Sequence, residues 1–262
     1  ETMFWATIDK ETLQEIVNVL GSAVDEAALS ITTGKMHYRT LPDGTIDGER
    51  TTLGAEIRVM DGAHVVMIVV KMQPNLFGTF EADDEQVLGI DLDKLKQILK
   101  DCYDGQDIEL SADSTKHLTV RAASSVHVLD FVDPAGMAEP KVPNLNLPAR
   151  FKVPMARLQK ATRKVDAVSD HLTVRVAPEG ALLLAHDTDA VVTDLMPLNI
   201  ECSKAVWASY PADYFSNMVK AIPGWQIVEV QIGQDYPIRL KWSLKDGAGT
   251  VKYMLAPRIE IE

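Results

Sequence analysis

The chain has 262 residues, of which 46% are hydrophobic and 24% charged, a balance that is typical of a globular protein and excludes a disordered one. With 38 acidic against 26 basic side chains, its formal net charge of −12 makes the average surface repel nucleic acid and acidic membranes. Its two cysteines, Cys102 and Cys202, lie far apart, which excludes a disulfide framework or a spaced metal motif and indicates a reduced, intracellular protein.

The first half predicts strands around two helices. Leu13, Ile16, Val17, Leu20 and Val24 recur at helical spacing, with Asp9 or Thr12 as the N-cap. A second helix has Leu92, Leu95, Ile98 and Leu99 on one face. Residues 34–54 are polar and rich in turn signals, and predict a long hairpin or loop. Strands are predicted at residues 4–8, 28–32, 56–60, 65–72, 108–110, 118–121 and 126–131.

Residues 132–148 carry four prolines. Proline donates no backbone hydrogen bond and biases the preceding residue toward extended conformations. We therefore expect an extended, partly stiff connector near the middle of the chain.

The second half repeats this order. Leu158, Ala161, Val165 and Val168 form an apolar helical stripe, and residues 213–221 form a further helix. Strands are predicted at residues 151–153, 172–176, 181–185, 190–195, 227–232, 238–243 and 251–255.

The two halves can be aligned with each other. Asp93, Leu95 and Lys100 match Asp213, Phe215 and Lys220 at a constant offset of 120 residues. Two helices and many antiparallel strands in each half predict an α+β fold of two similar domains, residues 1–131 and 149–262, joined by the connector 132–148.

The helices of this acidic chain carry basic outward faces. The helix after Pro154 bears Arg157, Lys160, Arg163 and Lys164 opposite its apolar stripe, and the second and last helices bear Lys96, Lys100 and Lys220. Lysine-rich helix faces are often merely solvated. The functional alternative is a track that neutralises DNA phosphates without reading bases.

No catalytic constellation stands out. His186, Asp187 and Asp189 make a loose metal or phosphoryl motif without a partner cluster, and we expect no metal and no cofactor there. Ser169, Asp170 and His171 are residue types of a catalytic triad, but adjacency in sequence is not triad geometry. The longest clean apolar run, residues 65–70, is too short to cross a membrane.

The segment Tyr253-Met254-Leu255-Ala256-Pro257 is either ordinary core or the floor of a groove for a partner's short hydrophobic motif. Four motifs of this region then carry a resemblance: Leu255-Ala256-Pro257-Arg258-Ile259-Glu260, Val168-Ser169-Asp170-His171-Leu172, Lys220-Ala221-Ile222-Pro223 and Asp235-Tyr236-Pro237. With them, nearly the whole chain resembles the sliding-clamp family, proliferating cell nuclear antigen of the archaeal type.

That resemblance implies a homotrimeric ring with helices lining the hole and sheets outside, and no enzymatic activity. Duplex DNA passes through the hole, a clamp loader opens the ring, and DNA polymerase, flap endonuclease and DNA ligase dock through clamp-interacting peptides. It also implies a cytoplasmic location, or a nuclear one in a eukaryote. Two alternatives stay open: an acidic protein-interaction module, and a subunit of a heteromeric clamp that does not self-assemble.

The resemblance also assigns site residues. Lys100, Lys160, Arg163 and Lys220 match DNA-facing positions, and helical geometry adds Lys96 and Lys164. The partner-peptide pocket matches His64, Val65, Met137, Pro237, Met254, Leu255, Ala256 and Pro257.

Two further expectations concern the outer surface and the subunit contacts. Residues 34–54 are longer than the family's usual connection at this point, and they change the outer surface or a partner contact. Head-to-tail closure needs an exposed strand edge in each half, which we expect near residues 117–128 and 181–185.

Overall fold

The computed structural model describes residues 4–34, 36–40, 46–50, 53–113, 116–137, 140–187 and 189–258. Within it the chain divides into two compact units. The first unit comprises Glu1–Val59, Val69–Glu139 and Ser243–Thr250, and the second comprises Met60–Ile68, Pro140–Trp242 and Val251–Glu262. The turn around residue 64 therefore belongs with the second unit, although it lies early in the sequence.

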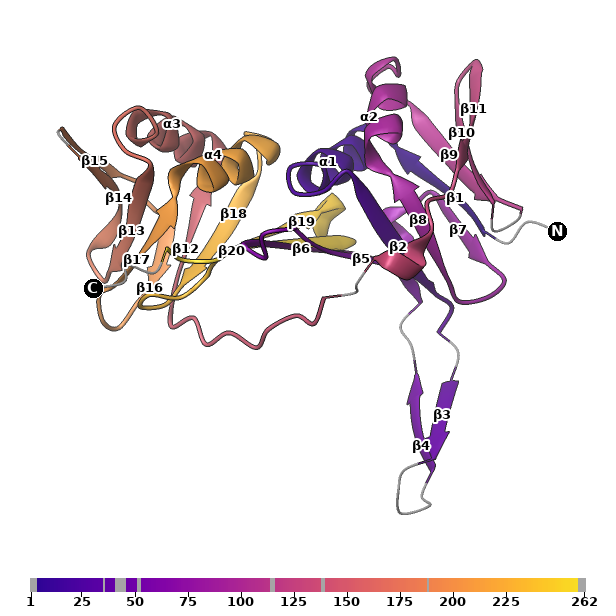
Figure 1. Cartoon of the computed structure of the whole chain (residues 1–262), viewed down its shortest axis with the longest axis horizontal. Coiled ribbons are helices and arrows are strands. Elements are labelled where there is room, and N and C mark those ends of the chain that lie inside the picture. Colours follow the sequence, from indigo (N-terminus) through magenta and orange to yellow (C-terminus); the bar gives the residue numbers. More distant parts are fainter. Residues whose placement is uncertain are drawn as a thin grey trace. The chain divides into compact units, whose positions relative to one another are not determined.

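Two helices lie on one face of the strands in each unit (Figure 1). The helices are α1 (Lys10–Leu20), α2 (Leu92–Lys100), α3 (Met155–Val165) and α4 (Ala212–Ala221), with short 3-10 turns η1 (Pro74–Leu76), η2 (Pro134–Gly136) and η3 (Lys245–Gly247). The strands up to the connector are β1 (Phe4–Asp9), β2 (Glu26–Thr32), β3 (Met36–Thr40), β4 (Ile46–Arg50), β5 (Gly54–Met60), β6 (Val66–Met72), β7 (Thr79–Ala82), β8 (Gln86–Asp91), β9 (Asp107–Ala112), β10 (His117–Ala122) and β11 (Ser125–Asp130). After the connector come β12 (Ala149–Pro154), β13 (His171–Ala177), β14 (Gly180–His186), β15 (Ala190–Asp194), β16 (Asn199–Glu201), β17 (Val206–Pro211), β18 (Ile227–Ile232), β19 (Ile238–Leu244) and β20 (Gly249–Leu255).

The strand orders show the duplication directly. In the first half the order β11-β10-β9-β1-β7 is matched in the second half by β20-β19-β18-β12-β16. Likewise β6-β5-β2-β8 is matched by β15-β14-β13-β17. Each half thus builds the same antiparallel arrangement, which confirms the predicted α+β fold class and the internal repeat.

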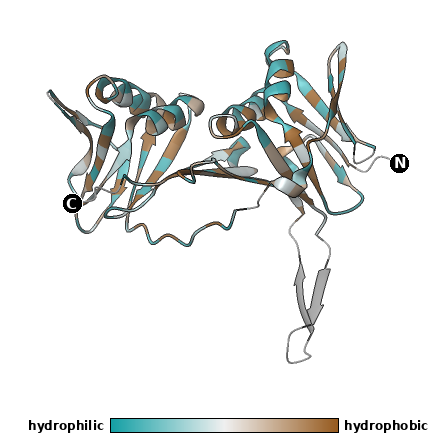
Figure 2. Cartoon of the chain, viewed as in Figure 1, coloured by the Kyte–Doolittle hydropathy of each residue, from teal (hydrophilic) through white to brown (hydrophobic). Residues whose placement is uncertain are grey.

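Local sequence explains where the helices begin. The Asp9 side chain caps α1 by accepting from the Thr12 backbone N–H at 2.8 Å, and Asp91 caps α2 by accepting from Lys94 at 2.9 Å. In the second unit α3 and α4 follow Pro154 and Pro211, without a side-chain cap. Hydrophobic and hydrophilic residues alternate along the strands, so that one strand face packs under the helices (Figure 2).

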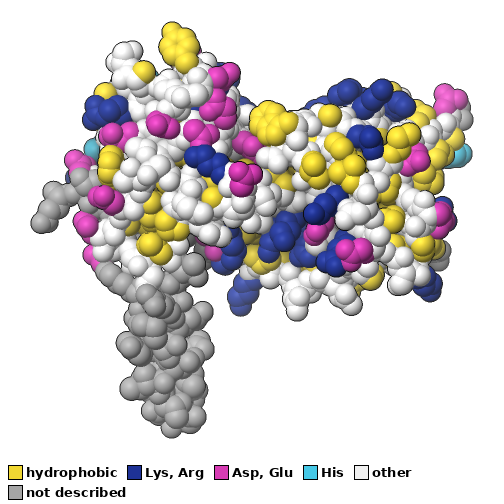
Figure 3. All heavy atoms as spheres, turned by 180° about the vertical axis from the view of Figure 1, so that it is seen from behind, with side chains coloured by type: hydrophobic (Ala, Val, Ile, Leu, Met, Phe, Trp, Pro, Cys, Tyr) yellow, Lys and Arg dark blue, Asp and Glu magenta, His cyan; other side chains and the backbone are white. Residues whose placement is uncertain are grey.

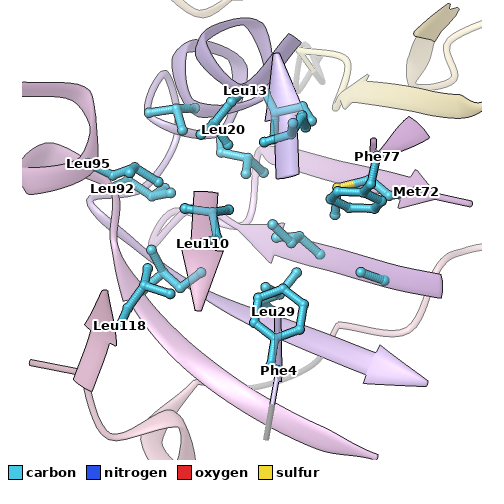
Figure 4. A pocket seen from close by; sticks show the side chains of 16 residues that line it. Phe4, Leu13, Leu20, Leu29, Met72, Phe77, Leu92, Leu95, Leu110 and Leu118 are labelled. Carbon is cyan, nitrogen blue, oxygen red and sulfur yellow. The ribbon is translucent and has the colours of Figure 1, made fainter. Parts of the chain in front are cut away.

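The core of the first unit contains a small cavity of about 40 Å³ (Figure 4). Its lining is apolar and includes Phe4 from β1, Leu13 from α1 and Leu95 from α2. A cavity of this kind stays dry because water would find no polar partner in it. We therefore regard it as a packing defect of the core.

The hairpin predicted within residues 34–54 is represented by β3 and β4, and the residues between these two strands lie outside the described ranges. β3 and β4 pair antiparallel, with Met36 opposite Arg50 and Thr40 opposite Ile46. The connector begins as an extension of the first unit, because Val132 bridges Gly89 on β8. A Cβ atom on Gly89 would lie 2.0 Å from the Val132 carbonyl oxygen, so only glycine permits this contact.

Several predicted boundaries differ from the structure. α1 ends at Leu20, so Val24 lies outside it, and the strands β7, β8, β16 and β17 were not predicted. The expected edge strand at residues 181–185 is wrong, because β14 pairs with β13 on one side and β15 on the other. The edge of that sheet is β15. The other expected edge includes β11, which does lie at the edge of its sheet.

Candidate functional site

The outward faces of α3 and α4 carry four exposed cations. Lys160, Arg163 and Lys164 lie on α3 and Lys220 lies in the last turn of α4, opposite buried residues such as Leu158 and Val219. None of the four forms an ion pair with another residue in the part of the chain that the structure describes. Their charges are therefore available to a ligand. Figure 3 shows Lys and Arg side chains gathered over this helical edge of the second unit.

Side-chain hydrogen bonds fix α3 against α4. Gln159 on α3 donates from Nε2 to the carbonyl oxygens of Ile222 at 2.9 Å and Val219 at 3.2 Å, which the end of α4 leaves without helical partners. Farther along, the Ser216 hydroxyl donates to Asp166 at 3.1 Å. Sequence reasoning missed Gln159, because a polar residue on a helix carries no signal of its partner.

These bonds frame a groove between the two helices. It measures about 170 Å³ and is lined by Gln159, Thr162, Arg163, Ser216, Val219 and Lys220. The groove brings together Arg163 and Lys220, two cations that lie 57 positions apart in the sequence. A positively charged groove without carboxylates in its lining suits a phosphate group.

The first unit contributes fewer exposed cations. On α2, Lys100 is exposed and Lys96 is half-buried. Lys94 is tied to Asp91 by a 2.9 Å ion pair.

In the second unit, Arg157 on α3 differs from the four exposed cations. It is half-buried and donates to the Met196 carbonyl oxygen, so its charge is not available to a ligand in the same way.

The residues of the second unit that the sequence predicts to bind a partner peptide surround a turn centred on Asp61. Its buried carboxylate accepts from the Val65 and Val66 backbone N–H groups, each at 2.7 Å, and from Ala63 at 3.3 Å. His64, near the tip, adopts a left-handed φ of 58°. Asp61 and Gly62 are residue types that favour turns, but the sequence does not indicate how many hydrogen bonds Asp61 makes.

Residues 256–258 are anchored to this turn and to β17. The Ala256 backbone N–H donates to the Val65 carbonyl oxygen at 2.9 Å, and Arg258 N–H donates to Ser209 on β17 at 2.7 Å. The Tyr210 hydroxyl donates to the Tyr236 carbonyl oxygen at 2.8 Å, next to Pro237, and burial raises the pKa of this phenol. Residues 209–210 therefore hold both the C-terminal segment and the turn before β19.

The predicted docking residues differ in exposure. His64 is exposed, Val65, Pro237, Ala256 and Pro257 are half-buried, and Met254 and Leu255 are buried. Met137 is half-buried but belongs to the first unit.

The residues with catalytic side chains do not form a relay. His171 Nδ1 lies 2.7 Å from Asp170 and 3.3 Å from the Ser169 hydroxyl, so one nitrogen faces both groups. A triad needs the acid on one imidazole nitrogen and the nucleophile on the other. The hydrogen bond from His171, aided by Arg258 at 3.3 Å, lowers the pKa of Asp170 against the effect of desolvation.

The described residues hold neither a cluster of metal ligands nor a helix that could span a membrane. Across the described ranges no three His, Cys, Asp or Glu side chains gather where they could hold a metal ion. The backbone N–H of Asp187 closes a turn onto the Asp189 carbonyl oxygen at 2.9 Å. No described helix is long and apolar enough to cross a membrane.

Comparison with known proteins agrees with this architecture. The family model of the proliferating cell nuclear antigen N-terminal domain matches residues 39–126. A DNA polymerase sliding clamp of Methanococcoides burtonii is 32% identical over 98% of this chain and 99% of its own length. A DNA polymerase sliding clamp of Halobacterium salinarum is also 32% identical, with 98% and 99% covered.

Solved structures show the same fold. The structure of the C-terminal region of FEN-1 bound to A. fulgidus PCNA superposes with a TM-score of 0.86 at 25% identity, covering 99% of this chain and 100% of that chain. PCNA from Thermococcus kodakaraensis gives a TM-score of 0.85 at 21% identity, covering 97% and 100%.

Proposed function

The chain belongs to the proliferating cell nuclear antigen family of DNA polymerase sliding clamps, and from this membership we propose that three copies encircle duplex DNA and tether enzymes to it. The tether is topological, so it needs only weak attraction inside the ring. No catalytic step is assigned to the chain.

The unpaired cations on α3 and α4 carry this proposal. In a chain of net charge −12, four exposed cations gather on two adjacent helices, and two of them share one groove. Lys and Arg attract DNA by neutralising phosphates and releasing counterions, which requires no base sequence. Lys96 and Lys100 on α2 extend the DNA-facing set in the first unit.

Closure of the ring uses the sheet edges β11 and β15. Both edges expose apolar side chains: Val126 and Val128 are 52% and 61% exposed, and Val192 is 62% exposed. Unpaired strand edges that also expose valine favour pairing with another chain. We assign the residues 1–131 and 149–262 to the two domains of each subunit, with the connector 132–148 between them.

The docking site is the surface formed by Val65, Pro237, Ala256 and Pro257, with His64 at its border and Met254 and Leu255 beneath. Met137, in the connector, is the remaining residue that we propose to contact a partner peptide. An apolar surface on a hydrogen-bonded frame suits the short hydrophobic motif of a partner enzyme. The A. fulgidus relative binds the C-terminal region of FEN-1, which belongs to the flap endonucleases expected here. DNA polymerase, DNA ligase and a clamp loader are the other partners.

A topological assay tests the encirclement. The protein is loaded onto closed circular plasmid DNA with a clamp loader, and retention is measured by gel filtration before and after one restriction cut. Retention on the circle followed by release from the linear DNA supports encirclement, whereas retention after cutting contradicts it.

Charge reversal tests which face meets DNA. Arg163→Glu with Lys220→Glu should reduce loading and salt-sensitive DNA affinity. Lys152→Glu with Lys241→Glu is the matched control, because these exposed lysines lie on β12 and β19, on the sheet face opposite the buried Phe151. Equal effects of the two pairs would contradict the assignment.

A further inference from the structure

The turn between α4 and β18 exposes an indole beside the basic helix. Trp225 is 72% exposed, whereas Trp242 in the same unit is 3% exposed. Tryptophan is buried on average, because its large apolar surface is costly to hydrate. Trp207 of the same unit is also exposed, at 49%, so exposure alone does not mark a site. Trp225 is set apart by the basic helix to which its turn is bonded.

Backbone hydrogen bonds hold this turn against the start of α3. Met155 N–H donates to the Gln226 carbonyl oxygen at 2.8 Å, and Ala156 N–H donates to Gly224 at 3.1 Å. A Cβ atom on Gly224 would come within 3.7 Å of the Ala156 Cβ atom. The indole is thus carried by a fixed turn, so that binding costs little ordering of the backbone.

The same face of α3 continues into the basic residues. Ala156 and Lys160 are four residues apart and both are exposed, and Arg163 and Lys164 follow in the next turn. The turn that carries Trp225 is bonded to this helix at Ala156, one helical turn before Lys160. The turn with the exposed tryptophan and the row of cations therefore adjoin on one helix.

Aromatic rings and cations together suit single-stranded nucleic acid. The cations follow the phosphates while the ring stacks on a base, whose face is free only where the strand is unpaired. We propose that Trp225 is a stacking site for an unpaired nucleobase of DNA held by the basic face of α3, so that the chain prefers a single-strand–duplex junction to blunt duplex. This inference rests on the proposed function, since it takes α3 as a DNA-facing helix.

The first unit supplies an internal contrast. Tyr103, 80% exposed, lies in the corresponding turn after α2, which is held to α1 by Lys10 N–H donating to Gln106 at 2.8 Å. Its neighbours are acidic: Asp104 pairs with Lys10 at 2.6 Å, and Glu11 accepts from the Gly105 N–H at 2.5 Å. Carboxylates repel the phosphates that would bring a base to Tyr103, so this ring should not bind DNA.

The experiment measures the affinity of the full chain for two fluorescent oligonucleotides, a blunt duplex and the same duplex with a thymidine overhang, across a salt titration. Trp225→Ala should weaken binding to the overhang substrate by about 5- to 20-fold, a typical loss for one base–aromatic stack. Binding to blunt duplex should not change. The slope of log affinity against log salt should stay that of the unaltered chain, because the number of neutralised phosphates is the same.

Two variants control for folding and for generic aromatic contact. Trp225→Phe keeps a stacking ring and should restore most of the loss, and Tyr103→Ala should change neither affinity. Equal losses on both substrates, no loss on either, or an equal loss for Tyr103→Ala would overturn the inference. If the unaltered chain binds neither substrate, or binds both and Trp225→Ala is silent, this inference fails. The proposed function is decided separately by the plasmid assay, because a topological tether needs no measurable affinity for a short open-ended duplex.

Discussion

Removing the Asp61 carboxylate should destabilise the proposed docking surface, and the hydrogen bonds of this carboxylate set the expected loss of unfolding free energy. Two backbone N–H groups, those of Val65 and Val66, donate to the same oxygen at 2.7 Å, and the amide of Val66 is buried. A hydrogen bond to a charged group contributes about 1.5–3 kcal/mol, so Asp61→Ala should lower the free energy of unfolding by about 3–5 kcal/mol. That is a large part of the ~5–15 kcal/mol that stabilises a typical domain.

Asp61→Asn is the matched variant. It keeps an acceptor oxygen at nearly the same place, and neutral hydrogen bonds contribute about 0.5–1.5 kcal/mol each, so the loss should be roughly half that of alanine. Urea denaturation measures the loss of unfolding free energy in both variants. Amide hydrogen exchange shows which part of the chain is destabilised. The amides of Val65 and Val66 should exchange faster because they lose their acceptor, and the amide of Ala256 should do so because it bonds to the Val65 carbonyl oxygen.

The same variants link the turn to docking. A clamp-interacting peptide titrated by calorimetry should bind Asp61→Ala more weakly than Asp61→Asn, and the unaltered chain most tightly. A loss below about 1 kcal/mol for alanine, or unchanged exchange at Ala256, would refute the view that Asp61 holds this surface together.

Two more substitutions test single contacts. Gly89→Ala places a methyl group against the Val132 carbonyl oxygen and should destabilise the chain by about 1–3 kcal/mol in thermal denaturation, while Gly136→Ala, which meets open space, should not. Asp9→Ala removes a helix cap and should cost about 1 kcal/mol, while Asp9→Asn keeps the cap. Burial raises the pKa of Asp9, but the hydrogen bonds from Lys245 and from the capped Thr12 outweigh burial and lower this pKa below its ordinary value of 3.8. The ionised carboxylate therefore stabilises the fold above pH 3.8, and this stabilisation is lost as the pH falls through the lowered pKa. Acid titration of stability should show this loss in the unaltered chain and not in Asp9→Asn.

The sequence was informative where hydrophobic periodicity was long and regular. The stripes of α2 and α4 predicted both helices and, through the offset between Lys100 and Lys220, the duplication. β8 contains Gly89 and β17 ends at Pro211, and both residue types disfavour a strand, so neither segment gave a clear strand pattern. β16 has only three residues, too few for a pattern.

Contacts between distant segments could not be predicted from one sequence. Helical spacing placed Arg163 and Lys220 outward, but only the structure shows that they share one groove. The prediction that residues 181–185 form an edge strand failed for the same reason. β14 and β15 are both rich in apolar residues, and their order in the sheet is decided by pairing and not by composition. Trp225 gave no helical or strand signal because it lies in a turn.

Electron microscopy of the purified full chain with a short duplex tests the central claim most directly. The account predicts three-fold rings with α1 to α4 on the inner wall and DNA density passing through the hole beside Lys160, Arg163 and Lys220. Single unassembled chains at micromolar concentration, or rings whose helices lie on the outer wall, would contradict it.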